Sequence, residues 1–304
     1  MLAHSTLSDI LIFFILGLLA GADVKKVLVL ADSRSRMVAK TLKRVMRSIR
    51  EHAGVLQFDL CGSPDIEREK AHLAFVFGGD GSILRAVQLL GANQIPIVGI
   101  NVGRLGFLTE FSVKEFLEAL PEIISGKRAP SERLMLKATL HCARLRQKKD
   151  STFYAANEAT VSRVGFLSMV KVGLSIDGSS ITSYSGDGVI VATPTGSTAY
   201  SLSCGGPILL PGTAALVVTP INPHTLTNRP LVVPAAREIA LEVLSQRQEA
   251  ALSIDGQVNV PLHETDVVSI RKADRVFRLV ENYPFYITLR QKLNWGGTPN
   301  YGKD

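Results

Sequence analysis

The residues best suited to chemistry in this chain form the pentapeptide Gly78-Gly79-Asp80-Gly81-Ser82. An apolar run, 73–77, precedes it and an apolar helical pattern, 83–90, follows it, which predicts a strand, a glycine turn and a helix. The glycines allow backbone N–H groups to approach a bulky anion, and the helix N-terminus adds a favourable dipole. Because the Asp80 carboxylate would repel a triphosphate, we expect it to receive a proton or to hold a bridging metal ion. The turn therefore favours phosphoryl transfer over simple nucleotide storage.

A second polar segment follows the buried run 189–192 and has the sequence Thr-Pro-Thr-Gly-Ser-Thr-Ala-Tyr-Ser over residues 193–201. Pro194 and Gly196 shape a turn, and the hydroxyl and N–H groups can bind phosphate or ribose. A turn of this composition often only caps a helix, here one starting near Ser197. Capping needs one hydroxyl, whereas this segment carries five Ser or Thr residues and Tyr200. The excess favours a binding role.

Polar residues also occur inside the β-like half of the chain. Asn157 and Glu158 interrupt the strand-like segment 152–164. Asn can bind an adenine edge or an amide, and Glu accepts hydrogen bonds from ribose hydroxyls. Asp187 and Asp255 are further carboxylates, each followed by glycine. Each Asp-Gly pair is by itself more typical of a hairpin turn than of a site.

Composition and charge exclude several classes of protein. The chain of 304 residues is 46% hydrophobic, so it can form sizeable cores, and its formal charge is +7. The basic residues are scattered, and the densest patch, 144–149, is expected at a hairpin tip. Without a basic stripe and interleaved aromatic residues we expect no nucleic-acid partner. A mild positive field suits an enzyme for polyanionic nucleotides, although a merely soluble basic surface is an equal alternative. No Walker A, GxGxxG, GxSxG or HExxH motif occurs.

Cysteine usage and the first residues bear on location. Cys61, Cys142 and Cys204 form neither a CxxC pair nor a disulfide framework, which predicts a reduced, cytoplasmic protein. The apolar run 10–19 is short for a membrane span, and no Lys or Arg precedes it as in a secretory signal. We therefore expect residues 1–23 to lie outside the fold, with no membrane partner. Export, anchoring and a start codon assigned too far upstream are the alternatives.

The fold class follows from the order of the periodic segments. Strand-like and helix-like segments alternate over 24–130, which predicts a Rossmann-like, doubly wound α/β domain with ligands at the carboxyl ends of its strands. Over 131–280 short β-like segments dominate, which predicts a β-sandwich domain. Residues 281–304 are expected to form an arm or helix that returns to the first domain. The predicted β segments are 25–30, 54–60, 73–77, 95–100, 134–141, 152–164, 169–176, 188–192, 238–245 and 266–271, and the predicted long helices are 33–52, 83–90 and 113–125.

These motifs together resemble the signature set of NAD kinases, the ATP-dependent or polyphosphate-dependent enzymes that make NADP. The resemblance rests on the glycine turn, Asn157-Glu158, the Gly-Asp-Gly run 186–188 and the polar run 193–203. The segments 99–109 and 218–231 also resemble the family. The glycine turn alone is shared with lipid kinases and, in similar form, phosphofructokinases, whereas the run 193–201 is far more specific.

The resemblance implies an acceptor, a donor and a set of residue roles. The terminal phosphoryl group of ATP or polyphosphate would pass to the 2′-hydroxyl of the adenosine ribose of NAD, and Asp80 would be the general base. The donor or product phosphate would lie near Gly78, Gly79, Gly81, Ser82 and Arg85, and the NAD adenosine near Asn157, Glu158, Thr198, Ala199, Tyr200, Ser201 and Ser203. Asp187 would contact NAD across the interface of a homodimer or homotetramer, and Gln257 matches a position near the ligand.

The expected cofactor is Mg²⁺ or another divalent cation. The sequence offers no P-loop lysine and no obvious aspartate pair, so no protein ligand to a metal is predicted. The cation would be held mainly by the phosphates of the donor, since Mg²⁺ retains most of its water.

Two other functions remain open at this point. A lipid or sphingoid-base kinase would share the glycine turn, yet it should lack Asn157-Glu158 together with the run 193–201, and it should have an apolar tunnel. A catalytically silent NAD-sensing regulator could keep the pocket, yet it would not need an intact glycine turn with Asp80.

Overall fold

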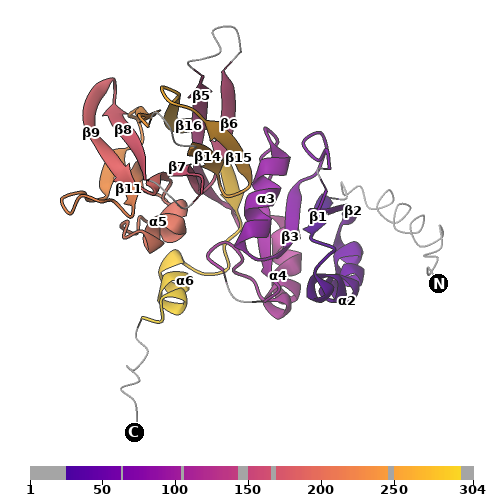
Figure 1. Cartoon of the computed structure of the whole chain (residues 1–304). Helices are drawn as coiled ribbons and strands as arrows, with labels where there is room; N and C mark the ends of the chain where they lie inside the picture. Colours follow the sequence, from indigo (N-terminus) through magenta and orange to yellow (C-terminus); the bar gives the residue numbers. More distant parts are fainter. Residues whose placement is uncertain are drawn as a thin grey trace.

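The computed structural model describes residues 25–62, 64–103, 106–142, 150–165, 169–245 and 250–295. Two units lie side by side in it, one with helices packed on strands and one that is nearly all strand (Figure 1). The predicted fold class, an α/β unit followed by an all-β unit, is confirmed. The apolar run 10–19 and the whole basic patch, 144–149, lie outside the described residues.

In the α/β unit, four strands pair in parallel in the order β2-β1-β3-β4. Helices α2 and α4 pack on one face of this sheet, and α3 packs on the other. Alternate residues of β1 supply the two cores, with Val27 and Val29 on one face and Leu28 and Leu30 on the other. The doubly wound arrangement is therefore as predicted. The bounds are β1 Lys26–Ala31, α2 Arg36–His52, β2 Gly54–Asp59, β3 Leu73–Gly78, α3 Asp80–Leu90, β4 Ile97–Asn101 and α4 Val113–Ser125.

The starts of the three helices differ in a way that bears on ligand binding. The Ser35 side chain caps α2, and Ser112 forms a capping box with Glu115 at the start of α4. Helix α3 instead follows Gly79 and has no side-chain cap. Its first N–H groups therefore have no capping side chain, and an anion could satisfy them.

The all-β unit has two layers. One layer is a six-stranded antiparallel sheet in the order β12-β11-β10-β7-β14-β15. The other is the extension of the first sheet through β16, β13, β8 and β9, with the β5–β6 hairpin beside β16. Side chains from both layers form one core, as in a sandwich. The bounds are β5 Ser131–His141, β6 Ser151–Ala155, β7 Glu158–Arg163, β8 Val170–Ile176, β9 Ser179–Gly186, β10 Gly188–Ala192, β11 Ala215–Ile221, β12 Leu231–Pro234, β13 Ile239–Val243, β14 Ala250–Ile254, β15 Val258–Leu262 and β16 Val267–Leu279.

The segment 152–164, expected as one strand, is two. Strand β6 ends at Ala155 in the first sheet, and β7 begins at Glu158 in the second. The chain changes sheets at Ala156 and Asn157, and residue type alone cannot reveal such a crossing because both strands have a similar mixture of apolar and polar residues. The predicted binding pair Asn157-Glu158 thus stands at a corner of the sandwich.

Strand β16 joins the two units. It pairs along β5 with a bulge between Lys272 and Val276, and its last residue, Leu279, pairs with Ile97 of β4. The chain then continues into α6 (Phe285–Lys292), whose Phe285 ring lies 6.4 Å from that of Phe107. The C-terminal arm, residues 281–295, therefore contacts the loop that follows β4.

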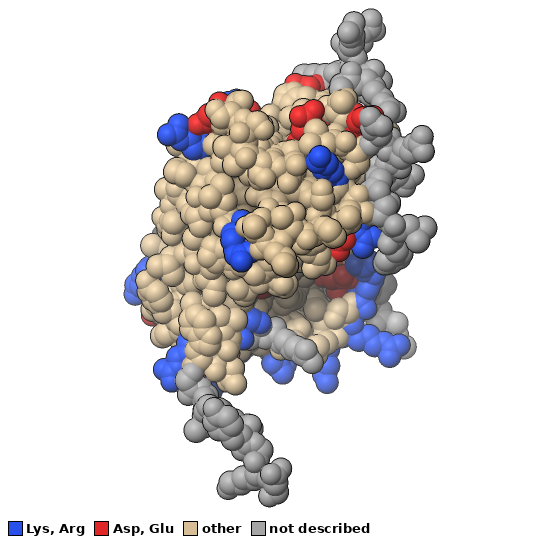
Figure 2. Space-filling model, turned by 60° about the vertical axis from the view of Figure 1, so that its left-hand side comes forward, with Lys and Arg blue, Asp and Glu red and all other residues tan. Residues whose placement is uncertain are grey.

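The surface agrees with the scattered charge expected from the sequence. Figure 2 shows that uncharged residues cover most of one face and that Lys and Arg stand in separate groups on it, with several along its lower edge. Among the described residues, no helix is long and apolar enough to cross a membrane.

Candidate active site

Asp80 is the first residue of α3, and its half-buried carboxylate is held by the loop after β4. Oδ2 accepts the N–H of Phe107 at 2.8 Å, and Oδ1 accepts those of Leu108 and Thr109 at 2.9 and 3.1 Å. The Thr109 hydroxyl adds a bond of 3.2 Å to Oδ1. Because a carboxylate has about four acceptor positions, two on each oxygen, Oδ2 is the atom with capacity left for a further donor.

Glycines in two segments make this geometry sterically feasible. A side chain at Gly106 would place its Cβ 1.8 Å from Asp80 Oδ1, and one at Gly99 would place it 2.3 Å from the Leu108 carbonyl oxygen. Within the glycine turn, a Cβ at Gly78 would lie 2.2 Å from Ser82 Oγ, whereas Gly79 and Gly81 have nothing within 4 Å. The turn therefore has open space beside Gly79 and Gly81, where we expected a phosphate.

Arg85 lies one helical turn after the glycine turn, as its spacing predicted. Its guanidinium donates to the carbonyl oxygen of Gly62, in the loop after β2, at 3.1 Å. The side chain is half-buried, and this contact holds it on the side of the sheet where β2 ends.

Asp255 organises the corner that carries Asn157 and Glu158. Its buried carboxylate accepts the backbone N–H groups of Ala156, Asn157 and Glu158 at 2.8, 2.8 and 3.0 Å. A fourth donor, the side-chain amide of Gln88, comes from α3 at 3.2 Å. The helix that begins with Asp80 is therefore bonded directly to the predicted dinucleotide-binding corner.

Three polar atoms at this corner have no hydrogen-bond partner among the described residues. They are Asn157 Oδ1, Glu158 Oε2 and Thr195 Oγ1, and all three are buried. The three residues are neighbours, because Thr193 donates its N–H to Asn157 O at 2.8 Å and a Cβ on Gly196 would lie 2.2 Å from that oxygen. Buried polar atoms without partners are costly, so a polar ligand would stabilise this corner.

Glu158 also has a strongly shifted acidity. Burial raises the pKa of Glu158 to about 8, and the nearby charge of Asp255 adds to the effect. Burial also raises the pKa of Asp255. Perturbed carboxyl groups of this kind cluster at functional sites.

Most hydroxyl groups of the run 193–201 are already used within the protein. Thr193 Oγ1 donates to Ala156 O at 2.6 Å, Ser197 Oγ to Pro194 O at 2.6 Å, and Thr198 Oγ1 to Thr195 O at 3.1 Å. Ser201 Oγ bonds Thr219 Oγ1 at 2.8 Å inside the core. The excess of hydroxyls therefore builds the turn, a short 3₁₀ helix (Gly196–Thr198) and the helix α5 (Tyr200–Ser203).

The remaining predicted site residues lie either on or beside α5 or in the turn between β14 and β15. Ala199 is half-buried beside the corner, and Tyr200 and Ser203 are exposed on α5. Gln257 is in the turn between β14 and β15, two residues after Asp255.

Among the predicted NAD-binding residues, Asp187 lies at the opposite end of β10 from the corner, although its charge still acts on Tyr200 of α5. It precedes β10, whereas Thr193 follows that strand, so about 17–20 Å of strand lies between them at ~3.4 Å per residue. Its carboxylate binds Arg163 Nε at 2.6 Å and Asn222 Nδ2 at 2.9 Å, and the Arg163 bond is the main reason its pKa is lowered.

The two Asp-Gly pairs turned out differently. Asp255 and Gly256 have φ values of 50° and 64° and form the β14–β15 hairpin turn, so the turn prediction is confirmed there. Asp187-Gly188 instead joins β9 of one sheet to β10 of the other, so the hairpin prediction is wrong. Gly188 is needed because its Cβ would lie 2.3 Å from the Val161 carbonyl oxygen.

Comparison with known proteins places this site in a family. Residues 21–128 match the profile of the ATP-NAD kinase N-terminal domain, and residues 156–282 match that of the ATP-NAD kinase C-terminal domain. An NAD kinase from Koribacter versatilis is 37% identical over 90% of this chain and 99% of its own length. One from Geobacter metallireducens is 39% identical over 74% of this chain and 80% of its own length. The chain belongs to the NAD kinase family.

Solved structures agree with this assignment. A yeast NADH kinase complexed with NADH has the same fold, with a TM-score of 0.81 over 92% of this chain and 90% of that one, at 23% identity. An NAD kinase from Archaeoglobus fulgidus in complex with ATP gives a TM-score of 0.69 at 28% identity over 88% of this chain and 98% of its own. NAD kinases are phosphotransferases with an alcohol group as acceptor. Neither the lipid-kinase alternative nor the silent-regulator alternative finds support.

One feature that the sequence analysis missed adjoins the glycine turn of this NAD kinase family member. Asp32 follows β1 directly and Asp59 is the last residue of β2, and their ligand atoms lie with Cys61 Sγ within 4.8 Å of one another. A partial signal was present, since each aspartate stands at the carboxyl end of a predicted strand, but the sequence did not indicate that these two strands are neighbours. Arg34 binds Asp32 at 2.7 Å and is the main cause of its lowered pKa. The pKa of Asp59 is lowered as well, mainly by a hydrogen bond with the side chain of Ser33.

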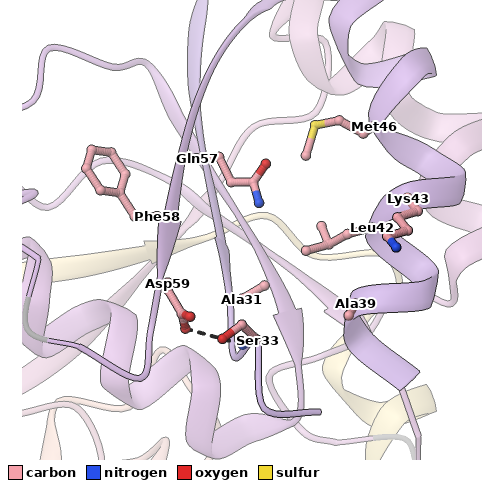
Figure 3. Close-up of a pocket in the computed structure, with 9 residues that line it drawn as sticks. All are labelled: Ala31, Ser33, Ala39, Leu42, Lys43, Met46, Gln57, Phe58 and Asp59. Atoms are coloured by element: carbon pink, nitrogen blue, oxygen red, sulfur yellow. Dashed lines mark hydrogen bonds between the residues drawn. The ribbon is translucent and has the colours of Figure 1, made fainter. Parts of the chain in front are cut away.

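A cavity of about 460 Å³ opens beside this cluster, between α2 and the strands β1 and β2 (Figure 3). Ser33 and Asp59 form its polar end, and Leu42 and Met46 of α2 point into it. None of the predicted site residues lines it. This cavity is therefore separate from the predicted site residues of both units.

Proposed function

We propose that the protein transfers the terminal phosphoryl group of ATP to the 2′-hydroxyl of the adenosine ribose of NAD, with Asp80 as general base. The observation that carries this role is the free acceptor capacity of Oδ2, on a carboxylate that four donors hold in place. A positioned carboxylate that takes the proton of a ribose hydroxyl contributes typically ~10²–10⁴-fold.

The donor side is supported by the start of α3. Gly79 and Gly81 border open space, and no side chain caps the helix. A phosphate there would accept hydrogen bonds from N–H groups that no side chain caps and would gain from the helix dipole. We therefore propose Gly78, Gly79, Gly81 and Ser82 as the donor-phosphate turn, with Arg85 beside it. ATP is our proposed donor, and polyphosphate is the alternative that a direct assay decides.

The acceptor side is supported by the three unpaired atoms of the corner. Asn157 Oδ1 and Glu158 Oε2 would bind the adenosine of NAD, with Thr195 Oγ1 as an additional partner that the sequence did not single out. Ala199, Tyr200 and Ser203 lie on or beside the helix that follows Thr195, and Gln257 borders the same corner. Ser201 would act indirectly, because its hydroxyl faces the core.

A divalent cation belongs to the proposed reaction, where it neutralises phosphate charge. The protein groups at the glycine turn fit poorly as its ligands. Three donors occupy Asp80 Oδ1, the proposed mechanism assigns Oδ2 to the ribose hydroxyl, and Arg34 neutralises Asp32. We therefore propose that Mg²⁺ enters with the donor and that its phosphates hold it.

We propose boundaries, assembly and location as follows. The α/β unit would end near residue 130 and the sandwich near 280, since β5 begins at Ser131 and β16 ends at Leu279. A homodimer or homotetramer would bring Asp187 to a neighbouring NAD site, and the exposed Ile181 and Val232 suit such an interface. Free cysteines throughout the described residues suit the cytoplasm.

The test of the function is direct. The purified protein is incubated with ATP, Mg²⁺ and NAD, and NADP is measured with an NADP-specific coupled enzyme. We expect ATP-dependent NADP formation that Asp80→Asn abolishes. The proposal would be overturned if the protein binds NAD but forms NADP with neither ATP nor polyphosphate.

A further inference from the structure

A second buried carboxylate stands beside the loop that holds Asp80. Glu110 follows Thr109 directly and is only 2% exposed. Its Oε2 accepts the backbone N–H groups of Asn282 at 2.8 Å and Tyr283 at 3.3 Å. These two residues belong to the C-terminal arm, between β16 and α6. Glu110 thus bonds the end of the Asp80-binding loop to the arm.

The same loop has two other attachments. On one side, Phe111 pairs with β4, since Asn101 N donates to Phe111 O at 2.7 Å and Phe111 N to Gly99 O at 3.2 Å. On the other side, the arm covers Phe107 with the Phe285 ring at 6.4 Å and the Lys292 ammonium at 5.6 Å from the ring centroid. The three residues that donate to Asp80 are therefore held between β4 and the C-terminal arm.

The arm is itself held by buried charge. Arg133, 2% exposed, bonds Glu281, and Ser131 Oγ donates to the same carboxylate at 2.8 Å. Arg128 donates to Asn282 Oδ1 at 3.1 Å, and the Tyr283 hydroxyl donates to Glu115. Each contact joins the arm to a residue earlier in the chain. The arm is therefore a rigid support for the loop that holds Asp80.

Glu110 occupies this place at a cost. Burial raises its pKa, although two backbone N–H groups and Arg133 favour the charged form. Its second oxygen, Oε1, has no hydrogen-bond partner. An apolar residue would fill the space without this penalty, yet it could not accept the two N–H groups of the arm. The two hydrogen bonds that Glu110 accepts from the arm fix the position of the loop.

We propose that Glu110 is a positioning residue for phosphoryl transfer. By bonding the C-terminal arm, it sets the place of the three backbone donors that orient the Asp80 carboxylate. This inference rests on the proposed role of Asp80 as general base. It adds that residues of the C-terminal arm, far from the glycine turn in sequence, determine the turnover rate without contacting a substrate.

The test compares Glu110→Ala and Glu110→Gln with the wild type. We expect Glu110→Ala to lower kcat by roughly 10²-fold, the typical effect of a displacement of about 1 Å, with the KM values for NAD and ATP within about threefold. Glu110→Gln keeps an oxygen acceptor, so it should recover roughly tenfold in kcat over the alanine variant. Glu132→Ala is the control, since its exposed carboxylate pairs only with Arg278 and does not touch the loop.

Hydrogen exchange gives a readout that does not depend on activity. Peptides covering 106–111 should exchange faster in Glu110→Ala than in the wild type or in Glu132→Ala. If Glu110→Ala does not fold, Phe285→Ala takes its place, because it removes the ring contact to Phe107 from the same arm.

Asp80→Asn, measured in parallel, separates the two ideas. If Asp80→Asn forms NADP like the wild type, the proposed role of Asp80 as general base fails, and with it the premise of this inference. If Asp80→Asn is inactive while the arm variant retains the wild-type kcat, even with a lower melting temperature, the positioning role of Glu110 is overturned. A rise in KM alone would also overturn it.

Discussion

The two halves of the site satisfy their polar groups in opposite ways. At the glycine turn, Asp80 already has four donors from one loop. At the sandwich corner, Asn157, Glu158 and Thr195 each keep a buried oxygen without a partner. The reacting group is thus oriented before any substrate arrives, whereas the binding groups await theirs. Orientation in advance lowers the reorganisation needed during reaction, and unpaired atoms favour a ligand that pairs them.

The two halves are also connected. Gln88 lies on α3, the helix that begins with Asp80, and its amide bonds Tyr154 O at 2.6 Å and Asp255 Oδ2 at 3.2 Å. Asp255 in turn orders the corner. The distance between the base and the acceptor pocket is therefore set by a few bonds across the domain boundary.

Asp80→Asn should separate the roles of the two halves, turnover and NAD binding, most clearly. The amide cannot take the proton, so we expect kcat to fall by at least ~10²–10⁴-fold. NAD affinity, measured by calorimetry, should change little, because the corner is untouched. A variant with near wild-type turnover would remove Asp80 from the mechanism.

Gly106→Ala tests whether the orientation of Asp80 matters as well as its chemistry. The new Cβ would lie 1.8 Å from Asp80 Oδ1, so the carboxylate or the loop must move. We expect kcat to fall by roughly 10²-fold while NAD still binds. Gly212→Ala is the matched control, since a Cβ there meets nothing within 4 Å. Equal rates for the two variants would show that the position of the loop is unimportant.

Gln88→Ala tests the connection between the halves. It removes a donor from the buried Asp255, so we expect a loss of ~1–3 kcal/mol in the free energy of unfolding and a raised KM for NAD. Gln291→Ala, on the exposed face of α6, is the control. Denaturant unfolding and steady-state kinetics measure both effects, and an unchanged KM would show that α3 does not organise the corner.

The last prediction concerns the acidity of the corner. The ordinary pKa of glutamate is 4.5, and the pKa of Glu158 in the folded protein is about 8. At a pH between these two values, folded Glu158 keeps a proton that the unfolded chain releases. Stability of the ligand-free protein should therefore fall as pH rises through this window, by at most ~1.4 kcal/mol per pH unit. Glu158→Gln should lack this component. Thermal melts from pH 5 to 8.5 compare the two proteins, and parallel curves would contradict the raised pKa.

The sequence predicted what local pattern determines. Apolar spacing gave α2, α3 and α4 and the strands β1 to β5, β8, β10 and β13 to within three residues, and the glycine turn was placed correctly between β3 and α3. The strands β9, β11, β12, β14 and β15 were not among the predicted segments. Contacts between distant segments were not predictable in this way. The donors to Asp80 come from 27–29 residues further along the chain, and Asp32 and Asp59 meet only because β1 and β2 are neighbours.

Asp255 shows the limit most clearly. Turn preference correctly placed it in a hairpin. Nothing in that preference indicates that its carboxylate enters the protein interior to order Asn157 and Glu158, about 100 residues earlier. A local rule assigns the backbone conformation, and only the tertiary fold assigns the partners of the side chain.

The account depends on one contact that a crystal structure with bound NAD would measure. We predict that Asp80 Oδ2 lies within hydrogen-bonding distance, ~2.6–3.2 Å, of the 2′-oxygen of the adenosine ribose, while Oδ1 keeps its bonds to residues 108 and 109. A structure in which NAD fills the corner at Asn157 but the Asp80 carboxylate faces solvent, away from that oxygen, would contradict it.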